Sequence, residues 1–231
     1  MSQDVGGSRR ATLVARWPVG VGLTAWRYMW RTTPMRRQEA TETVAAPVVP
    51  LHLQGGAQLD EAGVGALYRR RYRVTISDNR LSPSDVMREI RSDPNRAAPK
   101  EFARFYKVGG GETGMEVGDE YLVRMPGPWD GPVRVVDVTS FSFRLVTLTG
   151  HLEAGQIEFR AVDDDGLLVF EIESWARSGD RLAAVLYDTL RMGKEVQLHM
   201  WTSFLEKVVS LSGGIRRGPI SIETSRLGPN G

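Results

Sequence analysis

Six short runs with strand-like composition follow one another between residues 104 and 176, and this series limits the fold more than any other feature. Glycine, proline, aspartate or serine separates each run from the next, and the Asp165-Gly166 pair is typical of a two-residue hairpin turn. Strands connected this tightly pair with their neighbours in antiparallel fashion. The sequence therefore predicts an antiparallel meander with strands at 104–108, 120–125, 132–138, 141–149, 156–162 and 167–176.

One strand and two short helical segments are predicted before this series. Residues 69–77 alternate apolar and polar side chains, as a half-buried strand does. Ser82 is a good helix N-cap and is followed by a proline and an early acid, so we expect a helix from 83 to about 92. A second helical turn is expected at 99–102.

A long amphipathic helix is predicted after the meander, from Asp180 to about Ser212. Residues of one face recur at spacings of three, four and seven, and two glycines follow the last of them. A single helix of this length has to pack along the sheet. Its predicted buried face consists of Leu182, Val185, Leu186, Thr189, Val196, Met200, Phe204, Val208 and Leu211.

Composition argues against several kinds of site. The 231 residues include no cysteine, so the chain can form neither a disulfide nor a thiolate metal site. Glu195 and His199 lie four residues apart on the predicted helix, but no third ligand is near them in sequence, so no metal is predicted. No phosphate-binding glycine loop or nucleophile elbow is present, and no cofactor is predicted. The formal net charge of +2 is too small to indicate nucleic acid binding.

Positive charge is concentrated at the N-terminus, where residues 1–60 carry seven arginines and four acids. We expect a basic N-terminal extension and linker over 1–65, a domain over 66–214 and a C-terminal tail over 215–231. Residues 17–37 mix aromatic and cationic side chains, which suits either an arm packed on the domain or peripheral membrane contact. No apolar run is long enough for a span, so we expect a cytoplasmic protein, with membrane association as the alternative.

Two loops between predicted strands carry side chains suited to a site. In the segment MPGPWDGP, prolines and glycines hold Trp129 at a hairpin tip, where it either gates a cavity mouth or covers the edge of the core. In GHLEAG, His151 and Glu153 are candidates for acid and base work, with a hydrogen-bonded solvated loop as the alternative. In an up-and-down meander these two connections should lie at the same end of the sheet.

Alternation within the last strand places Glu173 and Trp175 on one face and an apolar set on the other. Glu173 then faces solvent if the apolar set packs under the helix. In a curved sheet it could instead face a cavity, with Arg124 or Arg134 as its partner, because a carboxylate in apolar surroundings needs a partner or a raised pKa.

The order of elements, one strand, two short helices, six strands and a long helix, resembles the helix-grip arrangement of the START-like (SRPBCC) superfamily. Several segments are also similar to an uncharacterised bacterial family with a domain of unknown function. They are GVGLTAWRYMWRTTP, DPNRAAP, VRMPGPWDGPVRVVD, TLTGHLEAGQIEF, FEIESWARSGDRLA and KEVQLHMWT, and the likeness extends from about Val21 to Gly214. The resemblance implies an α+β fold in which a curved, seven-stranded antiparallel sheet wraps around the C-terminal helix and encloses a cavity for an apolar molecule.

Three functions follow as hypotheses. The first is binding, transfer or sensing of an apolar or amphipathic small molecule such as a lipid or isoprenoid. The second is an enzyme of the cyclase or hydratase kind that uses His151 with Glu153 or Glu158. The third is a non-catalytic protein that docks on a membrane or partner through its N-terminal arm. The residues expected to contact the small molecule are Arg124, Trp129, Glu158, Glu173, Trp175 and Met200.

Overall fold

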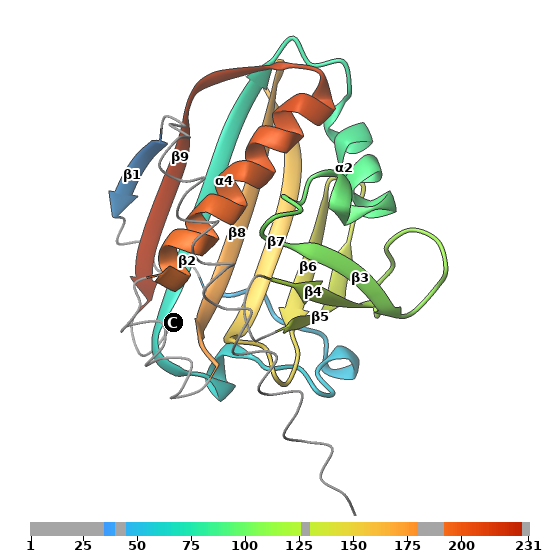
Figure 1. The fold of residues 1–231 in the computed structure, drawn as a ribbon, viewed down its shortest axis with the longest axis vertical. Helices are drawn as coiled ribbons and strands as arrows, with labels where there is room; N and C mark the ends of the chain where they lie inside the picture. Colours follow the sequence, from blue (N-terminus) through green and yellow to red (C-terminus); the bar gives the residue numbers. More distant parts are fainter. Residues whose placement is uncertain (1–34, 40–44, 126–129, 180–191, 228–231) are drawn as a thin grey trace, which may run out of the picture.

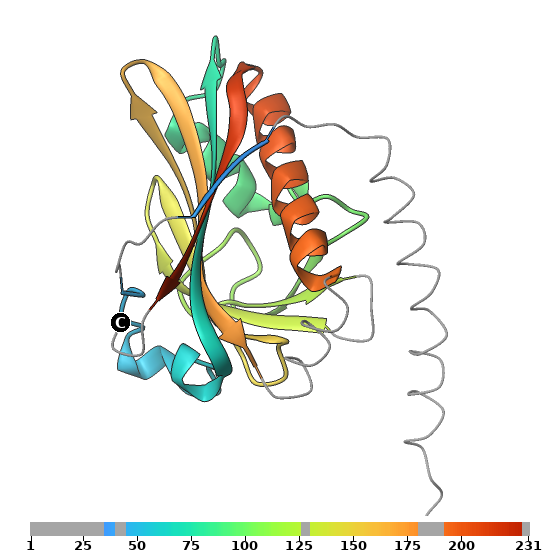
Figure 2. The same cartoon turned by 90° about the vertical axis from the view of Figure 1, so that its left-hand side faces the viewer.

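The computed structural model describes residues 35–39, 45–125, 130–179 and 192–227. Within them it has α+β architecture, with one large curved sheet that carries helices α2 and α4 on its concave face (Figures 1 and 2). The strands are β1 (Met35–Glu39), β2 (Val64–Ser77), β3 (Arg104–Gly109), β4 (Glu120–Arg124), β5 (Asp130–Val138), β6 (Ser142–Thr147), β7 (Glu153–Asp164), β8 (Leu167–Ser178) and β9 (Ile215–Leu227). The helices are α2 (Pro83–Ser92) and α4 (Met192–Ser212), with single 3-10 turns η1 (Leu51–Leu53), η2 (Asp60–Ala62) and η3 (Pro94–Arg96).

The predicted meander is present, and its strands pair in antiparallel fashion from β3 to β8. The β7–β8 hairpin closes as the Asp-Gly pair predicts, because Asp165 and Gly166 both have positive φ, 53° and 78°. Asp164 and Leu167 are the last paired residues on either side of this turn.

The expected count of seven strands is wrong, because the described residues alone form a sheet of nine strands in the order β1-β9-β2-β8-β7-β6-β5-β4-β3. Residues 215–227, which we expected to be a tail, form β9 and pair with the free edge of β2. Met35–Glu39 form β1 and pair in parallel with β9. The predicted domain limits at residues 65 and 214 stay predictions.

Helix α2 begins as its sequence predicts. The Ser82 hydroxyl accepts from the Asp85 backbone N–H, and the Asp85 carboxylate accepts from the Ser82 backbone, which completes a capping box. An additional turn, η3, begins at Pro94 immediately after the helix, where the Asp93 side chain accepts from the Asn95 backbone N–H. Residues 99–102 form a hydrogen-bonded turn, in which the Phe102 N–H donates to the Pro99 carbonyl at 2.8 Å.

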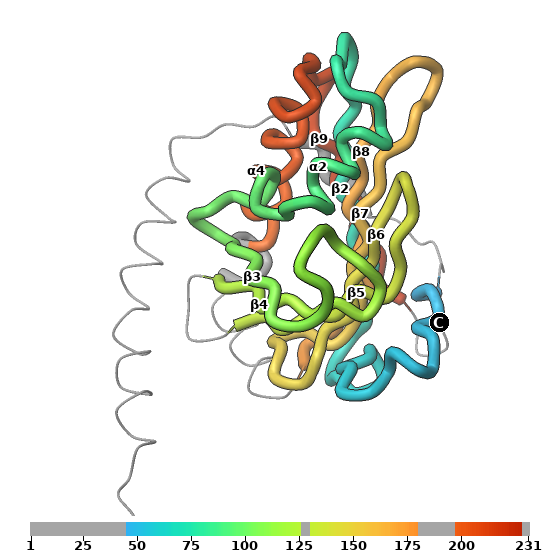
Figure 3. The backbone as a smooth tube through the Cα atoms, turned by 90° about the vertical axis from the view of Figure 1, so that its right-hand side faces the viewer, coloured from blue at the N-terminus to red at the C-terminus, as the bar shows by residue number. Residues whose placement is uncertain are grey.

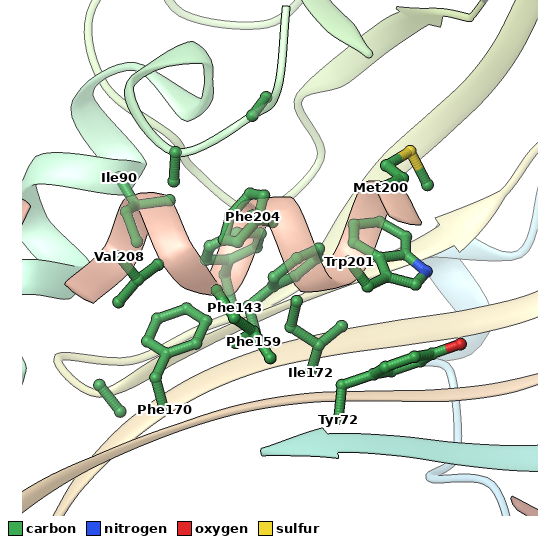
Figure 4. Close-up of a cluster of buried hydrophobic side chains, with 14 of the residues drawn as sticks. Tyr72, Ile90, Phe143, Phe159, Phe170, Ile172, Met200, Trp201, Phe204 and Val208 are labelled. Atoms are coloured by element: carbon green, nitrogen blue, oxygen red, sulfur yellow. The ribbon is translucent and has the colours of Figure 1, made fainter. Parts of the chain in front are cut away.

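Helix α4 packs on the concave face through an aromatic cluster (Figure 4). The rings of Phe143 and Phe159 stack with centroids 4.7 Å apart, and Phe204 of α4 lies 5.3 Å from Phe159 and 6.1 Å from Phe170. Trp201, one turn earlier on α4, meets Phe159 edge to face at 5.6 Å. Residues 180–191 of the predicted helix lie outside the described residues.

The connector before β2 packs on the convex face, opposite α4 (Figure 2). Val49 and Leu53 are buried there against Val136 of β5 and Val146 of β6. Gln156 donates to the Pro47 carbonyl at 2.8 Å and fixes the same segment to β7. Most of residues 17–37, for which membrane contact was considered, lie outside the described residues. No helix in the described part of the chain is long and apolar enough to cross a membrane.

Candidate functional site

The strand ends of β4 and β5 at Arg124 and Asp130 lie at the same end of the sheet as the β6–β7 connection, as the meander predicts. Val133 pairs with Thr147, and the Leu148 N–H donates to the Pro132 carbonyl at 2.9 Å. A Cβ at Gly131 would lie 2.9 Å from Nε2 of His151, so the imidazole packs directly against the start of β5. Trp129 lies outside the described residues, and its predicted gating role stays a prediction.

His151 is partly buried and holds the backbone of the next turn. The Glu153 N–H donates to its Nδ1 at 2.9 Å, and the same nitrogen lies 3.2 Å from the Glu153 carbonyl oxygen. Burial lowers the pKa of His151, and the nearby Glu153 opposes this shift only in part. The imidazole is therefore a neutral group near pH 7.

Glu153 is the first residue of β7 and faces α4. It shares a face with Ile157 and Phe159, because side chains two residues apart project to the same side of a strand. Its Oε2 accepts from Nε2 of Gln197 on α4 at 2.7 Å, and its Oε1 lies 3.8 Å from Nη1 of Arg70 on β2. A carboxylate thus lies between the sheet and the helix with two polar side chains directed at it.

The arginine in this cluster reaches Glu153 across β8. Arg70 pairs with Ser174, and Gly155 of β7 pairs with Ala176, so the residues beneath the guanidinium are small. Its guanidinium also lies 5.2 Å from the centroid of the Tyr68 ring, within cation–π range.

Gly155 is required at its position. Its φ of +152° is one that L side chains rarely adopt, and a Cβ there would lie 2.0 Å from the Trp175 carbonyl oxygen. The glycine allows the β7 and β8 backbones to approach closely, and it removes a side chain from this part of the sheet.

Side-chain size on the concave face therefore falls along the sheet. Near the C-terminal half of α4 the face carries Phe159, Phe170 and Ile172, which are almost completely buried. Toward Glu153 the next positions are Ile157 and Gly155 of β7, together with Ser174, Ala176 and Ser178 of β8. On α4, Met200 and Trp201 are both buried, Trp201 against Phe159, and Gln197 one turn earlier reaches Glu153.

Glu173 and Trp175 lie on the convex face, so the possibility that Glu173 faces a cavity is wrong. Glu173 forms a salt bridge with Arg69, and both side chains are buried; Nη2 of Arg160 lies 3.8 Å from its other carboxylate oxygen. The arginines considered as partners are elsewhere: Arg134 pairs with Glu120 at 2.6 Å. The apolar set of β8 packs under α4, which turns the alternate positions away from the helix.

Trp175 fills a small cluster on the convex face with Leu67 and Leu227. Leu227 belongs to β9, so this environment exists only because the C-terminal strand is part of the sheet. Contact of Trp175 with a ligand stays a prediction.

Glu158 also lies on the convex face, between Arg144 of β6 and Glu173 of β8 in the pairing register. Burial raises the pKa of its carboxyl, with smaller opposing effects from Arg160 and Arg144. Because Glu158 and Glu153 face opposite sides of β7, only Glu153 can share the concave side. Glu158 is thus remote from the polar cluster that faces α4.

Arg124 is exposed at the end of β4, and its guanidinium lies 5.1 Å from the centroid of the Tyr106 ring. Among the described residues that were named from the sequence, Glu153 faces α4, Met200 is buried in the apolar core, and His151 lies beside Glu153. His151 contacts the backbone of Glu153 and, among the described contacts, not its carboxylate. In the described part of the chain, no group of three potential metal ligands is present.

Sequence reasoning missed Arg70 and Gln197. The alternation of residues 69–77 carried a usable signal, since it places Arg70 on the face of Tyr72 and separates it from Arg69 and Arg71. No such signal in the sequence points to Gln197, because its orientation depends on how α4 is rotated about its axis on the sheet.

Solved structures with a similar course of the chain are distant in sequence. A hypothetical protein from Helicobacter pylori, jhp0584, has 11% identity and a TM-score of 0.49, with 75% of this chain and 99% of that chain covered. The di-domain ARO/CYC StfQ from the steffimycin biosynthetic pathway has 10% identity and a TM-score of 0.47, with 64% and 51% covered. A conserved protein from Geobacillus kaustophilus has 14% identity and a TM-score of 0.42, with 64% and 99% covered.

No curated protein matches the chain. One family model does, over residues 83–207, which span α2 to most of α4 and include both connections at the Glu153 end of the sheet. The chain therefore belongs to the DUF1990 family, whose description is a domain of unknown function.

Proposed function

We propose that the protein binds an amphipathic small molecule between the concave face of the sheet and α4, with START-like architecture as the resemblance implies. The observation that carries the proposal is the decrease in side-chain size along the concave face, from phenylalanine to glycine and serine. The smallest side chains lie next to the polar cluster of Arg70, Glu153 and Gln197. A ligand whose apolar part lies against Met200 and Trp201 would have its polar end at Arg70, Glu153 and Gln197.

The polar cluster supports an amphipathic ligand over a purely apolar one. Burying a carboxylate and a guanidinium costs free energy unless each is hydrogen-bonded, and the 3.8 Å separation of Arg70 and Glu153 is longer than a hydrogen bond. Arg70 therefore retains donors for a ligand acceptor, such as a carboxylate, carbonyl or hydroxyl oxygen. Lipids and isoprenoids that carry such a group are the ligand class that we propose.

The test combines native mass spectrometry with a substitution that fills the proposed site. We expect a small molecule to accompany the purified protein, and the anionic apolar dye 1-anilinonaphthalene-8-sulfonate to compete with it. Ser174→Phe places a large ring among the small residues and should weaken dye binding by at least about tenfold, the effect of losing 1.4 kcal/mol.

Ser174→Ala is the matched control and should bind the dye as the unmodified protein does. Urea unfolding of both variants establishes that Ser174→Phe is folded under the binding conditions. Equal dye affinity in the two folded variants, together with no accompanying molecule, would contradict the proposal.

A further inference from the structure

A second candidate site lies beside β3, the edge strand whose course Figure 3 shows, away from the residues between α4 and the sheet. A cleft of about 420 Å³ separates this strand from the residues that follow α2. Its volume falls in the range of small-molecule sites, about 300–1,000 Å³. Its lining consists of Asp93, Asn95, Arg96, Lys100, Arg104, Phe105 and Tyr106.

Asn95 fixes one wall of the cleft to the strand. Its Nδ2 donates to the Phe105 carbonyl at 2.9 Å, and its Oδ1 accepts from the Phe105 N–H at 2.8 Å. The side-chain amide thus forms hydrogen bonds with both the N–H and the carbonyl group of Phe105. An added peptide strand would find these groups occupied, so the cleft suits a small molecule better than β-strand addition.

The lining carries three cations and one carboxylate, and two of the cations have no ion-pair partner in the described part of the chain. Arg96 is held by Glu89, and Asp93 caps η3 through the Asn95 N–H at 2.9 Å. Lys100 and Arg104 are exposed and make no ion pair with a described residue. Their charges are therefore available to a ligand.

The neighbouring strand adds further positive charge instead of neutralising it. Arg104 pairs directly with Arg124 of β4, and like charges opposite each other on adjacent strands destabilise the pairing. Arg124 in turn lies over the Tyr106 ring, which is itself 40% exposed. The cleft thus combines an accessible aromatic ring with a cationic end.

We propose that this cleft binds a small organic anion, a phosphate group attached to a flat apolar body. The planar fork of Arg104 matches two phosphate oxygens, and Lys100 adds a second cation. Tyr106 offers its ring to the apolar body. The site is separate from the one proposed between α4 and the sheet, so either can fail without the other.

The experiment is a titration of uniformly ¹⁵N-labelled protein with phenyl phosphate, followed by amide chemical shifts. We expect saturable shifts centred on Lys100, Arg104 and Tyr106, and weaker binding of both inorganic phosphate and phenol. Arg104→Gln should weaken the binding of phenyl phosphate at least about tenfold, as expected for the loss of one charge-assisted hydrogen-bonded pair. Lys100→Gln should also weaken binding.

Arg226→Gln is the matched control, because Arg226 is an exposed arginine on β9, far from β3 in the strand order. It should change the affinity less than about twofold, since a charge beyond the Debye length of about 10 Å is largely screened. The proposal is overturned if millimolar phenyl phosphate gives no saturable shifts in these residues. It is also overturned if Arg104→Gln and Arg226→Gln have equal affinities, or if phenol binds as tightly as phenyl phosphate.

Discussion

Two glutamates of β7 show how strongly the face of a strand decides the chemistry of a side chain. Glu153 faces α4 and is held by Gln197 at 2.7 Å, whereas Glu158 faces the other way among the charged residues of the convex surface. Burial raises the pKa of Glu158, and the neighbouring Arg160 and Arg144 do not compensate for it. The charged form of this carboxyl is therefore less favourable in the folded chain than in the unfolded one.

This difference predicts how the stability of a Glu158→Gln variant depends on pH. A carboxyl whose pKa is raised on folding contributes stability below its usual value of 4.5 and loses that contribution as pH rises through the folded-state pKa. Glu158→Gln should therefore raise the urea midpoint at pH 7. The difference in midpoint between the variant and the unmodified protein should become smaller toward pH 4.

Glu112→Gln, at an exposed position, is the control for the loss of one negative charge. Its urea midpoint should stay close to that of the unmodified protein at both pH values. A lower midpoint for Glu158→Gln at pH 7 would show that the arginines outweigh burial.

At the scale of elements, β9 matters most for the sheet, because it covers the edge of β2 that would otherwise be free. Two isoleucines of this strand differ in environment: Ile220 is completely buried in the main core, and Ile215 is 60% exposed. Replacing each isoleucine with alanine therefore measures how much the burial of β9 side chains contributes to the stability of the fold.

Ile220→Ala should lower the free energy of unfolding by about 2–5 kcal/mol, the usual cost of truncating a buried isoleucine. Ile215→Ala should change it by less than about 0.5 kcal/mol, as at other surface positions. Urea denaturation followed by tryptophan fluorescence measures both values. Equal losses in the two variants would mean that β9 does not pack as the structure shows.

At the scale of the whole molecule, a single apolar cluster joins α2, α4 and strands from β2 to β9. Phe204 is at its centre, 1% exposed and in contact with the rings of Phe159, Phe170 and Trp201. Because helix and sheet share this cluster, they should unfold together as one cooperative unit.

Phe204→Ala should therefore lower the free energy of unfolding by about 3–5 kcal/mol. The urea midpoints measured by tryptophan fluorescence and by far-UV circular dichroism should fall by the same amount. Phe141→Ala provides the comparison, since Phe141 is 52% exposed and its loss should cost less than about 1 kcal/mol. Two separated transitions in the Phe204→Ala variant would show that α4 and the sheet are independent units.

Local sequence was enough to predict the β3–β8 meander, the Asp165-Gly166 turn, the Ser82 cap of α2 and, within the described part of α4, the burial of Met200, Phe204 and Val208. Each depends on neighbours along the chain, which periodicity and turn chemistry reveal. It also predicted that the ends of β4 and β5 lie at the same end of the sheet as the β6–β7 connection, since strands in a meander alternate in direction.

Which side of each strand faces the helix, and which segment covers the edge of β2, depended on contacts between strands that are distant in sequence. Glu173 has Arg69 as its partner, and Arg70 meets Glu153 across β8, because strands distant in sequence were brought into register. The segment 215–227 became a strand because β2 offered an unpaired edge and Ile220 and Ile222 could be buried there. Such long-range pairing leaves little trace in local sequence, because burial and backbone hydrogen bonds arise only when the partner strand is in place.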